Sequence, residues 1–138
     1  MTNDLVSDML TRIRNASLVR HSCVNIPYSK LNASILNVLI KEGFVSGYEN
    51  EKLSSSKKFI KVFLKYKGWW IKRPFFSTIK RISKPGQRIF CGYKDFQNKI
   101  TLLKYNQGVA IISTSSGIMS HPKAKKFKKG GEIICYIG

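Results

Sequence analysis

The stretch GVAIISTSSGIMSHP, residues 108–122, follows an apolar run with hydroxyl side chains and a glycine: Ser113, Thr114, Ser115, Ser116 and Gly117. Hydroxyl groups in this position have three chemical interpretations. They can shape an ordinary turn, one of them can act as a catalytic nucleophile, or together they can hydrogen-bond phosphate and sugar. The other reactive side chains of the sequence help to decide between these interpretations.

Nucleophilic catalysis needs a base within hydrogen-bond reach of the serine and a third group that orients the base. His121 is five residues beyond Ser116, but it precedes Pro122 in a lysine-rich stretch that supplies no orienting carboxylate. The segment also lacks the GxSxG motif of a nucleophile elbow. We therefore expect no enzyme activity, and a Ser/His hydrolase is the weakest alternative function.

Other kinds of catalytic or metal site are not indicated. No GxxxxGK[ST] phosphate-binding motif is present, and beyond residue 51 the only acids are Asp95 and Glu132. The cysteines, Cys23, Cys91 and Cys135, form no CxxC pair and accompany only two histidines, which argues against a disulfide framework and a zinc site. We expect no metal, no cofactor and no small-molecule substrate.

The charge balance favours a nucleic acid as partner. The chain has 25 basic and seven acidic residues, a net charge of +18, and residues 51–138 hold 20 of the basic residues but only three of the acidic ones. A compact lobe with this imbalance repels itself and is stabilised by a polyanion. No apolar run approaches the roughly 20 residues that span a bilayer, and neither a basic amphipathic helix nor a lipidation signal is present, so we expect no membrane partner.

Hydropathy patterns predict two helices and a strand in the first third of the chain. Residues 3–18 place Leu5, Met9, Ile13 and Ala16 on one helical stripe, with Asn3 as the expected N-cap. The segment VNIPYSK is typical of a short strand that ends at Pro27, after which Ser29 can cap a second helix. The predicted apolar face of that helix comprises Leu31, Ile35, Val38 and Leu39, with Gly43 just past its end.

The next segments predict a hairpin and a boundary. FVSGYE and KFIKVFLKYKG alternate in polarity as paired strands do, and NEKLSSSKK between them is expected to be a polar loop. Residues 67–74, KGWWIKRP, are expected to join two lobes. Trp69 and Trp70 are expected to cover that junction, and stacking on nucleic-acid bases is the alternative role.

The remaining segments predict a lobe that is mostly strand. FFSTIKRIS, the turn KPGQ and RIFCGYK have the pattern strand, turn, strand, and residues 95–107 suit a short helix with a loop. GVAIIST and GEIICYIG are β-branched, apolar strands joined by a lysine-rich connection. The predicted fold is α+β, with an N-terminal helix-strand-helix-hairpin α/β lobe (residues 1–66), a junction (67–74) and a basic, mostly antiparallel β lobe with a short helix (75–138).

Three groups of motifs, in order along the chain, resemble a known family. The first is DMLTRIRNA (residues 8–16) with IPYSKL (26–31) and KEGF (41–44). The second is RISKPGQRIF (81–90), and the third is ISTSSGIM (112–119) with the closing GGEIICYIG (130–138). Together they are similar to small-subunit ribosomal protein number eight of the bacterial and organellar type, and the similarity covers nearly the whole chain.

The resemblance implies a structural protein that binds the central domain of small-subunit rRNA directly and supports subunit assembly and translation. Its other expected partners are neighbouring ribosomal proteins of the small subunit. The alternative that stays open is a free-standing RNA-binding regulator. Matching positions imply RNA contacts at Ser113, Thr114, Ser115, Ser116, Gly117, Glu132, Arg81, Lys84, Arg88 and Lys30. Phe90 replaces the tyrosine usual in such proteins, so only a stacking contact is expected there.

The compartment is predicted from composition. High lysine content, divergent connections and an N-terminus unlike a presequence favour a protein encoded and used inside an organelle. The expected location is the small ribosomal subunit of the mitochondrial matrix, with a plastid or a bacterial cytoplasm as the alternative.

Overall fold

The computed structural model describes residues 4–53, 57–100 and 108–138. The chain divides into two compact units, unit 1 ending at Phe75 and unit 2 running from Phe76 to Gly138. Both combine helices with antiparallel strands, which confirms the predicted two-lobed α+β class. None of the described helices has the length and apolar character that crossing a bilayer requires.

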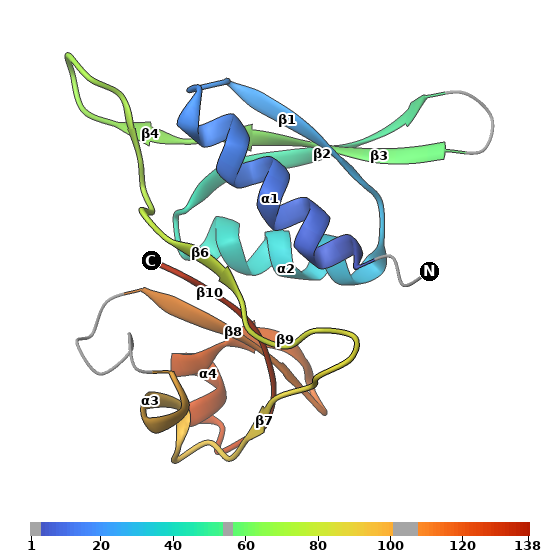
Figure 1. The fold of residues 1–138 in the computed structure, drawn as a ribbon, viewed down its shortest axis with the longest axis vertical. Helices are drawn as coiled ribbons and strands as arrows, with labels where there is room; N and C mark the ends of the chain where they lie inside the picture. The colour runs from blue at the N-terminus through green and yellow to red at the C-terminus, as the bar shows by residue number, and fades with distance from the viewer. Residues whose placement is uncertain (1–3, 54–56, 101–107) are drawn as a thin grey trace. The chain divides into compact units, whose positions relative to one another are not determined.

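The main body of unit 1 is formed by two helices and a three-stranded antiparallel sheet (Figure 1). The helices are α1 (Leu5–Leu18) and α2 (Lys30–Lys41). The sheet has the order β1 (Cys23–Pro27), β3 (Lys57–Leu64), β2 (Val45–Leu53). Buried side chains from both helices and from the sheet form the core, among them Met9, Ile13, Ile26, Ile35 and Ile60.

Helix α1 begins slightly later than predicted. Its N-cap is Asp4, whose carboxylate accepts a hydrogen bond from the Ser7 amide at 3.2 Å, and the predicted cap Asn3 lies outside the described residues. Leu5 was predicted to face the core but is 36% exposed, because the buried stripe begins one residue later at Val6. The other members of the predicted stripe are buried.

Helix α2 has the predicted cap and a different apolar face at its start. The Ser29 hydroxyl accepts from the Asn32 amide at 3.0 Å, as expected. Leu31 is 38% exposed, whereas Asn32 is fully buried. The Asn32 side-chain amide donates to the carbonyls of Leu5 and Pro27, at 3.3 and 3.2 Å, so it ties the start of α1 and the end of β1 to α2. These two hydrogen bonds explain why the buried position 32 holds an asparagine and not an apolar residue.

The predicted hairpin is present but longer than expected. Strands β2 and β3 pair from Val45 opposite Leu64 to Leu53 opposite Lys57, so most of NEKLSSSKK is strand instead of loop. Main-chain hydrogen bonds make the ladder, and polar side chains do not interrupt it. Residues 54–56 of the expected loop lie outside the described residues.

A small second hairpin occupies the predicted junction. Strands β4 (Tyr66–Lys67) and β5 (Arg73–Pro74) pair antiparallel within unit 1. Trp69 and Trp70 in its loop are 95% and 96% exposed. Neither ring packs against unit 1, so the expectation that they cover the junction between the two lobes stays a prediction.

Unit 2 is built around the long C-terminal strand β10 (Gly131–Ile137). On one edge β10 pairs with β8 (Val109–Thr114), which pairs in turn with β9 (Gly117–Ser120). On the other edge β10 pairs with β6 (Ile79–Arg81) and, nearer its start, with β7 (Phe90–Cys91). The strands predicted on either side of the KPGQ turn therefore both pair with β10.

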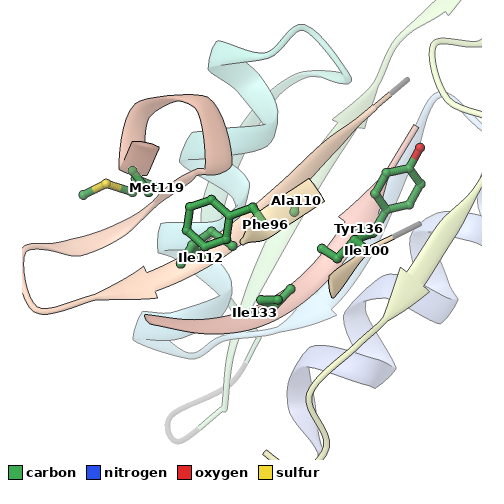
Figure 2. Close-up of a cluster of buried hydrophobic side chains, with 8 residues drawn as sticks. Phe96, Ile100, Ala110, Ile112, Met119, Ile133 and Tyr136 are labelled. Carbon is green, nitrogen blue, oxygen red and sulfur yellow. The ribbon is translucent and has the colours of Figure 1, made fainter. Parts of the chain in front are cut away.

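Two helices accompany this sheet, α3 (Phe96–Lys99) and α4 (His121–Lys126). Phe96, Ile112, Ile133 and Tyr136 belong to one buried cluster, shown in Figure 2. Helix α3 confirms the short helix expected after residue 95, and residues 101–107 of that prediction lie outside the described residues. Strand β9 and helix α4 were not predicted, because only a lysine-rich connection was expected there.

Two glycines allow β10 to start between β7 and β8. A Cβ on Gly131 would lie 2.0 Å from the Ser113 carbonyl oxygen, and a Cβ on Gly130 would lie 2.6 Å from the Cys91 carbonyl oxygen. Both distances are far below van der Waals contact, and the opposing atoms are main chain. The close approach of three strands at this point therefore requires residues without side chains.

The change Gly131→Ala is expected to destabilise unit 2. The added methyl group must separate β10 from β8, and overpacking of this kind costs about 1–3 kcal/mol. Gly86→Ala is the matched control, because a Cβ at Gly86 meets nothing within 4 Å. Urea unfolding followed by circular dichroism measures both variants, and equal stability of the two would contradict the close-approach argument.

Candidate nucleic-acid interface

The hydroxyl run forms the turn between β8 and β9. Ser113 and Thr114 end β8, and Gly117 begins β9. The Thr114 hydroxyl accepts from the Ser116 amide at 3.2 Å and donates to the Gly117 carbonyl at 2.8 Å. Gly117 has a φ of +114°, a region that L side chains rarely adopt. Thr114 and Gly117 therefore shape the turn, which leaves Ser115 exposed at its tip.

Register places four side chains in a row across the sheet. Glu132 of β10 is opposite both Phe90 of β7 and Ser113 of β8, and Ser113 is opposite Ile118 of β9. Directly opposite residues of antiparallel strands project from the same face. We call these four residues the Glu132 row.

The Glu132 row lies on the face of the sheet opposite the core cluster. The neighbouring register pairs, Ile112 with Ile133 and with Met119, belong to the buried cluster. Successive residues of a strand point to opposite faces, so the Glu132 row points away from that cluster. Phe90, 63% exposed, presents its ring at one end of this face.

Glu132, the single acid beyond the lysine-rich stretch, is paired with a base. Its Oε1 atom accepts from Arg88 Nη1 at 3.0 Å. The Glu132 side chain is 18% exposed and the Arg88 side chain 50%. Because a guanidinium carries five N–H donors, this bond positions Arg88 while most of its donor capacity remains for an anionic ligand.

The other predicted contacts have different positions. Arg81 Nη1 donates to the Ile134 carbonyl at 2.7 Å, where the β8–β10 register shifts, so part of this guanidinium supports the sheet. Lys84 is exposed in the turn where it bridges to Gln87, between β6 and β7. Lys30 is the first residue of α2 and belongs to unit 1, whereas the Glu132 row belongs to unit 2.

Helix α4 brings positive charge to the hydroxyl turn, a feature that sequence reasoning missed. The helix ends in a Schellman motif, in which the Lys129 amide donates to the Ala124 carbonyl at 2.9 Å and Lys128 has a φ of +56°. The chain then reverses toward β10, and the Lys129 ammonium hydrogen-bonds the Ser116 hydroxyl. The signal for this arrangement was Pro122, which suits the first turn of a helix.

His121 has a structural role instead of the role of a base. Its Nδ1 atom accepts from the Ala110 amide at 3.1 Å, which links α4 to β8 and requires an unprotonated nitrogen. Burial lowers the pKa of His121, and the nearby Lys125 lowers it further. A main-chain donor therefore occupies His121 Nδ1, and the Ser116 hydroxyl bonds Lys129. Among the described residues no three His, Cys, Asp or Glu side chains gather to hold a metal ion.

Because the pKa of His121 is lowered on folding, the unfolded chain binds this proton more readily. The contribution of His121 to stability is therefore retained above the unfolded pKa of about 6.5 and is lost as the pH falls below it. The His121→Asn variant retains an acceptor without titrating, so its stability should fall less between pH 7 and pH 5. Denaturant unfolding at both pH values measures this, and identical losses in both proteins would contradict the assignment.

Comparisons with known proteins support the resemblance seen in the motifs. A family model described as ribosomal protein S8 matches residues 4–137. Small ribosomal subunit protein uS8c of Phaeodactylum tricornutum is 44% identical over 137 residues, which is 99% of both chains. Small ribosomal subunit protein uS8 of Crocosphaera subtropica is 44% identical over 135 residues, 98% of this chain and 97% of that protein. The chain therefore belongs to the ribosomal protein S8 family, a family of structural, non-enzymatic proteins.

Proposed function

We propose that this protein binds small-subunit rRNA directly, in its central domain, and supports assembly of the small ribosomal subunit and translation. The observation that carries the proposal is the Glu132 row with the hydroxyl turn beside it. At this end of the sheet the row and the turn together supply hydroxyls, a positioned arginine, a lysine and an aromatic ring. RNA recognition uses these groups together, because it needs charge for phosphates, hydroxyls for the 2′-OH and rings for stacking.

Charge and hydroxyls make different contributions in this proposal. The positive field of residues 51–138 attracts any polyanion, and that attraction weakens as salt is added. Hydroxyl groups act only within hydrogen-bond distance, so their contribution depends on the shape of the RNA. We infer that the charge sets the strength of binding to all RNAs and that the hydroxyl turn distinguishes the cognate rRNA site.

Some of the proposed residues touch the RNA directly, and others position the residues that do. Ser113, Ser115 and Ser116 meet the RNA, while Thr114 and Gly117 contribute mainly by shaping the turn. Glu132 acts through Arg88, which it positions. The remaining contacts that we propose are Arg81 and Lys84 in unit 2 and Lys30 in unit 1. In this proposal residues 75–138 carry most of the rRNA-binding surface.

Relatives favour a plastid or bacterial small subunit as the location. Two of them, from Phaeodactylum tricornutum and Gracilaria tenuistipitata, are named uS8c, and the relative from Crocosphaera subtropica is cyanobacterial. The mitochondrial location expected from composition finds no support among them. Neighbouring small-subunit proteins are the other partners that we propose. Sedimentation of the protein away from small subunits, in light fractions only, would instead favour a free-standing regulator.

The Ser115→Ala variant is expected to lose affinity selectively for the cognate rRNA fragment. A lost hydrogen bond of about 1 kcal/mol corresponds to roughly a fivefold higher Kd. Lys125→Ala should weaken binding to cognate and scrambled RNA alike and should reduce the slope of log K against log salt by about 1. Ser115 is exposed and Lys125 lies on the surface of α4, so neither change should unfold the protein.

Filter binding of labelled RNA at several salt concentrations measures both effects. The scrambled fragment, of equal length and composition, controls for binding by charge alone. Equal losses on both RNAs for Ser115→Ala would show that the hydroxyl turn specifies nothing.

A further inference from the structure

The β4–β5 hairpin ends in an exposed aromatic tip. Residues 68–72 connect the two strands, and the tip comprises Trp69, Trp70 and Ile71, which are 95%, 96% and 55% exposed. Figure 1 shows the yellow-green loop beyond β4 extending away from the sheet of unit 1. Large aromatic side chains are seldom fully exposed, because burying one removes about 150–250 Å² of its surface from contact with water. Two such rings side by side indicate a contact with another molecule.

The tip has a defined shape. Gly68 has a φ of +106°, and a Cβ at this position would lie 2.3 Å from the Ile71 carbonyl oxygen. The turn is therefore tight enough to require glycine, and the tight turn holds the adjacent tryptophans at the end of the hairpin. Rings presented on a fixed turn lose less conformational entropy on binding than rings on a flexible segment.

The base of the hairpin is anchored to unit 1. The Tyr66 hydroxyl donates to the His21 carbonyl at 2.5 Å, just after the end of α1. The ammonium groups of Lys65 and Lys67 lie 4.8 and 5.8 Å from the centre of the Phe75 ring, at distances typical of cation–π contacts. These contacts secure both ends of the hairpin segment, while both tryptophans of the tip are almost fully exposed.

Charge around the tip identifies the chemistry of its partner. Lys67, Lys72 and Arg73 flank the tryptophans, and the sequence has no acidic residue between Glu51 and Asp95. A partner must therefore offer anionic groups together with flat surfaces that stack on indole rings. Unpaired nucleotides offer both, since each has a phosphate and a base whose face is exposed. A duplex hides these faces, and an anionic lipid surface has none.

We infer that the tip of the β4–β5 hairpin is a second RNA contact, at which Trp69 and Trp70 stack on unpaired nucleotides. This contact deepens the proposed function and rests on it for the identity of the RNA as rRNA. It uses unit 1, whereas the Glu132 row belongs to unit 2. The two contacts can therefore be tested separately.

Tryptophan fluorescence reports this contact directly, because Trp69 and Trp70 are the only tryptophans of the chain. The full-length protein is titrated with a single-stranded oligouridylate, an RNA duplex of equal charge, heparin, and vesicles that contain anionic lipid. Stacking on bases quenches indole fluorescence, so the single strand should quench strongly, and the duplex and heparin should quench little at saturation. Equal quenching by heparin, or a response to the vesicles alone, would overturn the inference.

Variants separate stacking from charge. Replacing both tryptophans by alanine should weaken oligouridylate binding at least tenfold in fluorescence anisotropy, while Trp69→Phe with Trp70→Phe should restore most of the affinity. Both changes are made at exposed positions, and circular dichroism checks that the fold is retained. Unchanged affinity in the alanine double variant would contradict the inference.

A further comparison separates failure of this inference from failure of the proposed function. Absence of quenching by oligouridylate in a protein that still prefers the cognate rRNA fragment over the scrambled one would overturn the inference and leave the proposed function standing. Quenching that persists in a protein with no preference for the cognate rRNA fragment would support the tip contact while rejecting the proposed rRNA-specific function.

Discussion

The close approach of three strands at the start of β10 is the constraint on which the candidate interface depends. Gly130 and Gly131 let β10 begin between Cys91 of β7 and Ser113 of β8, where any side chain would collide with main-chain oxygen. One residue further on, Glu132 then pairs with both neighbours and reaches Arg88. The glycines therefore act indirectly, because they set the register that gathers the hydroxyl, the ion pair and the aromatic ring on one face.

In the function that we propose, the same geometry makes a strongly basic protein selective for one RNA site. Lysines on α4 supply attraction that is insensitive to sequence, as phosphate contacts generally are. The hydroxyl turn is different, because Thr114 and Gly117 fix its shape and the Lys129 ammonium adjoins Ser116. A rigid group of hydrogen-bond donors and acceptors forms its full set of bonds only with an RNA whose surface fits it. In this proposal selectivity depends on the turn, and the total charge determines how strongly any RNA is attracted.

Local signals in the sequence predicted local structure well. Ser29 caps α2, Gly43 follows its end with a φ of +81°, and the β-branched segments form β8 and β10, because each depends on residues close in sequence. The pairing of strands that are far apart in the sequence was not predictable. Nothing near β6 or β7 indicates that β10 is their partner, and the buried Asn32 is explained only by carbonyls that the fold brings to it.

The candidate site was predicted in the same uneven way. The hydroxyl run and Glu132 were identified from their residue types and from the family resemblance, but their alignment in one row follows from strand register. In the sequence Lys129 cannot be distinguished from the neighbouring lysines. Its contact with Ser116 follows from the Schellman motif at the end of α4. Trp69 and Trp70 were expected to cover the junction between the lobes. Their exposure depends on a short hairpin, whose strands are too short to show an alternation of polar and apolar residues.

In the proposed function the turn between β8 and β9 touches rRNA. Ultraviolet crosslinking of the protein within assembled small subunits, followed by mass spectrometry of the RNA-linked peptides, tests it most directly. We expect the peptide containing residues 113–117 to be linked to small-subunit rRNA. Crosslinks confined to other peptides, with residues 113–117 unmodified in subunits that contain the protein, would contradict it.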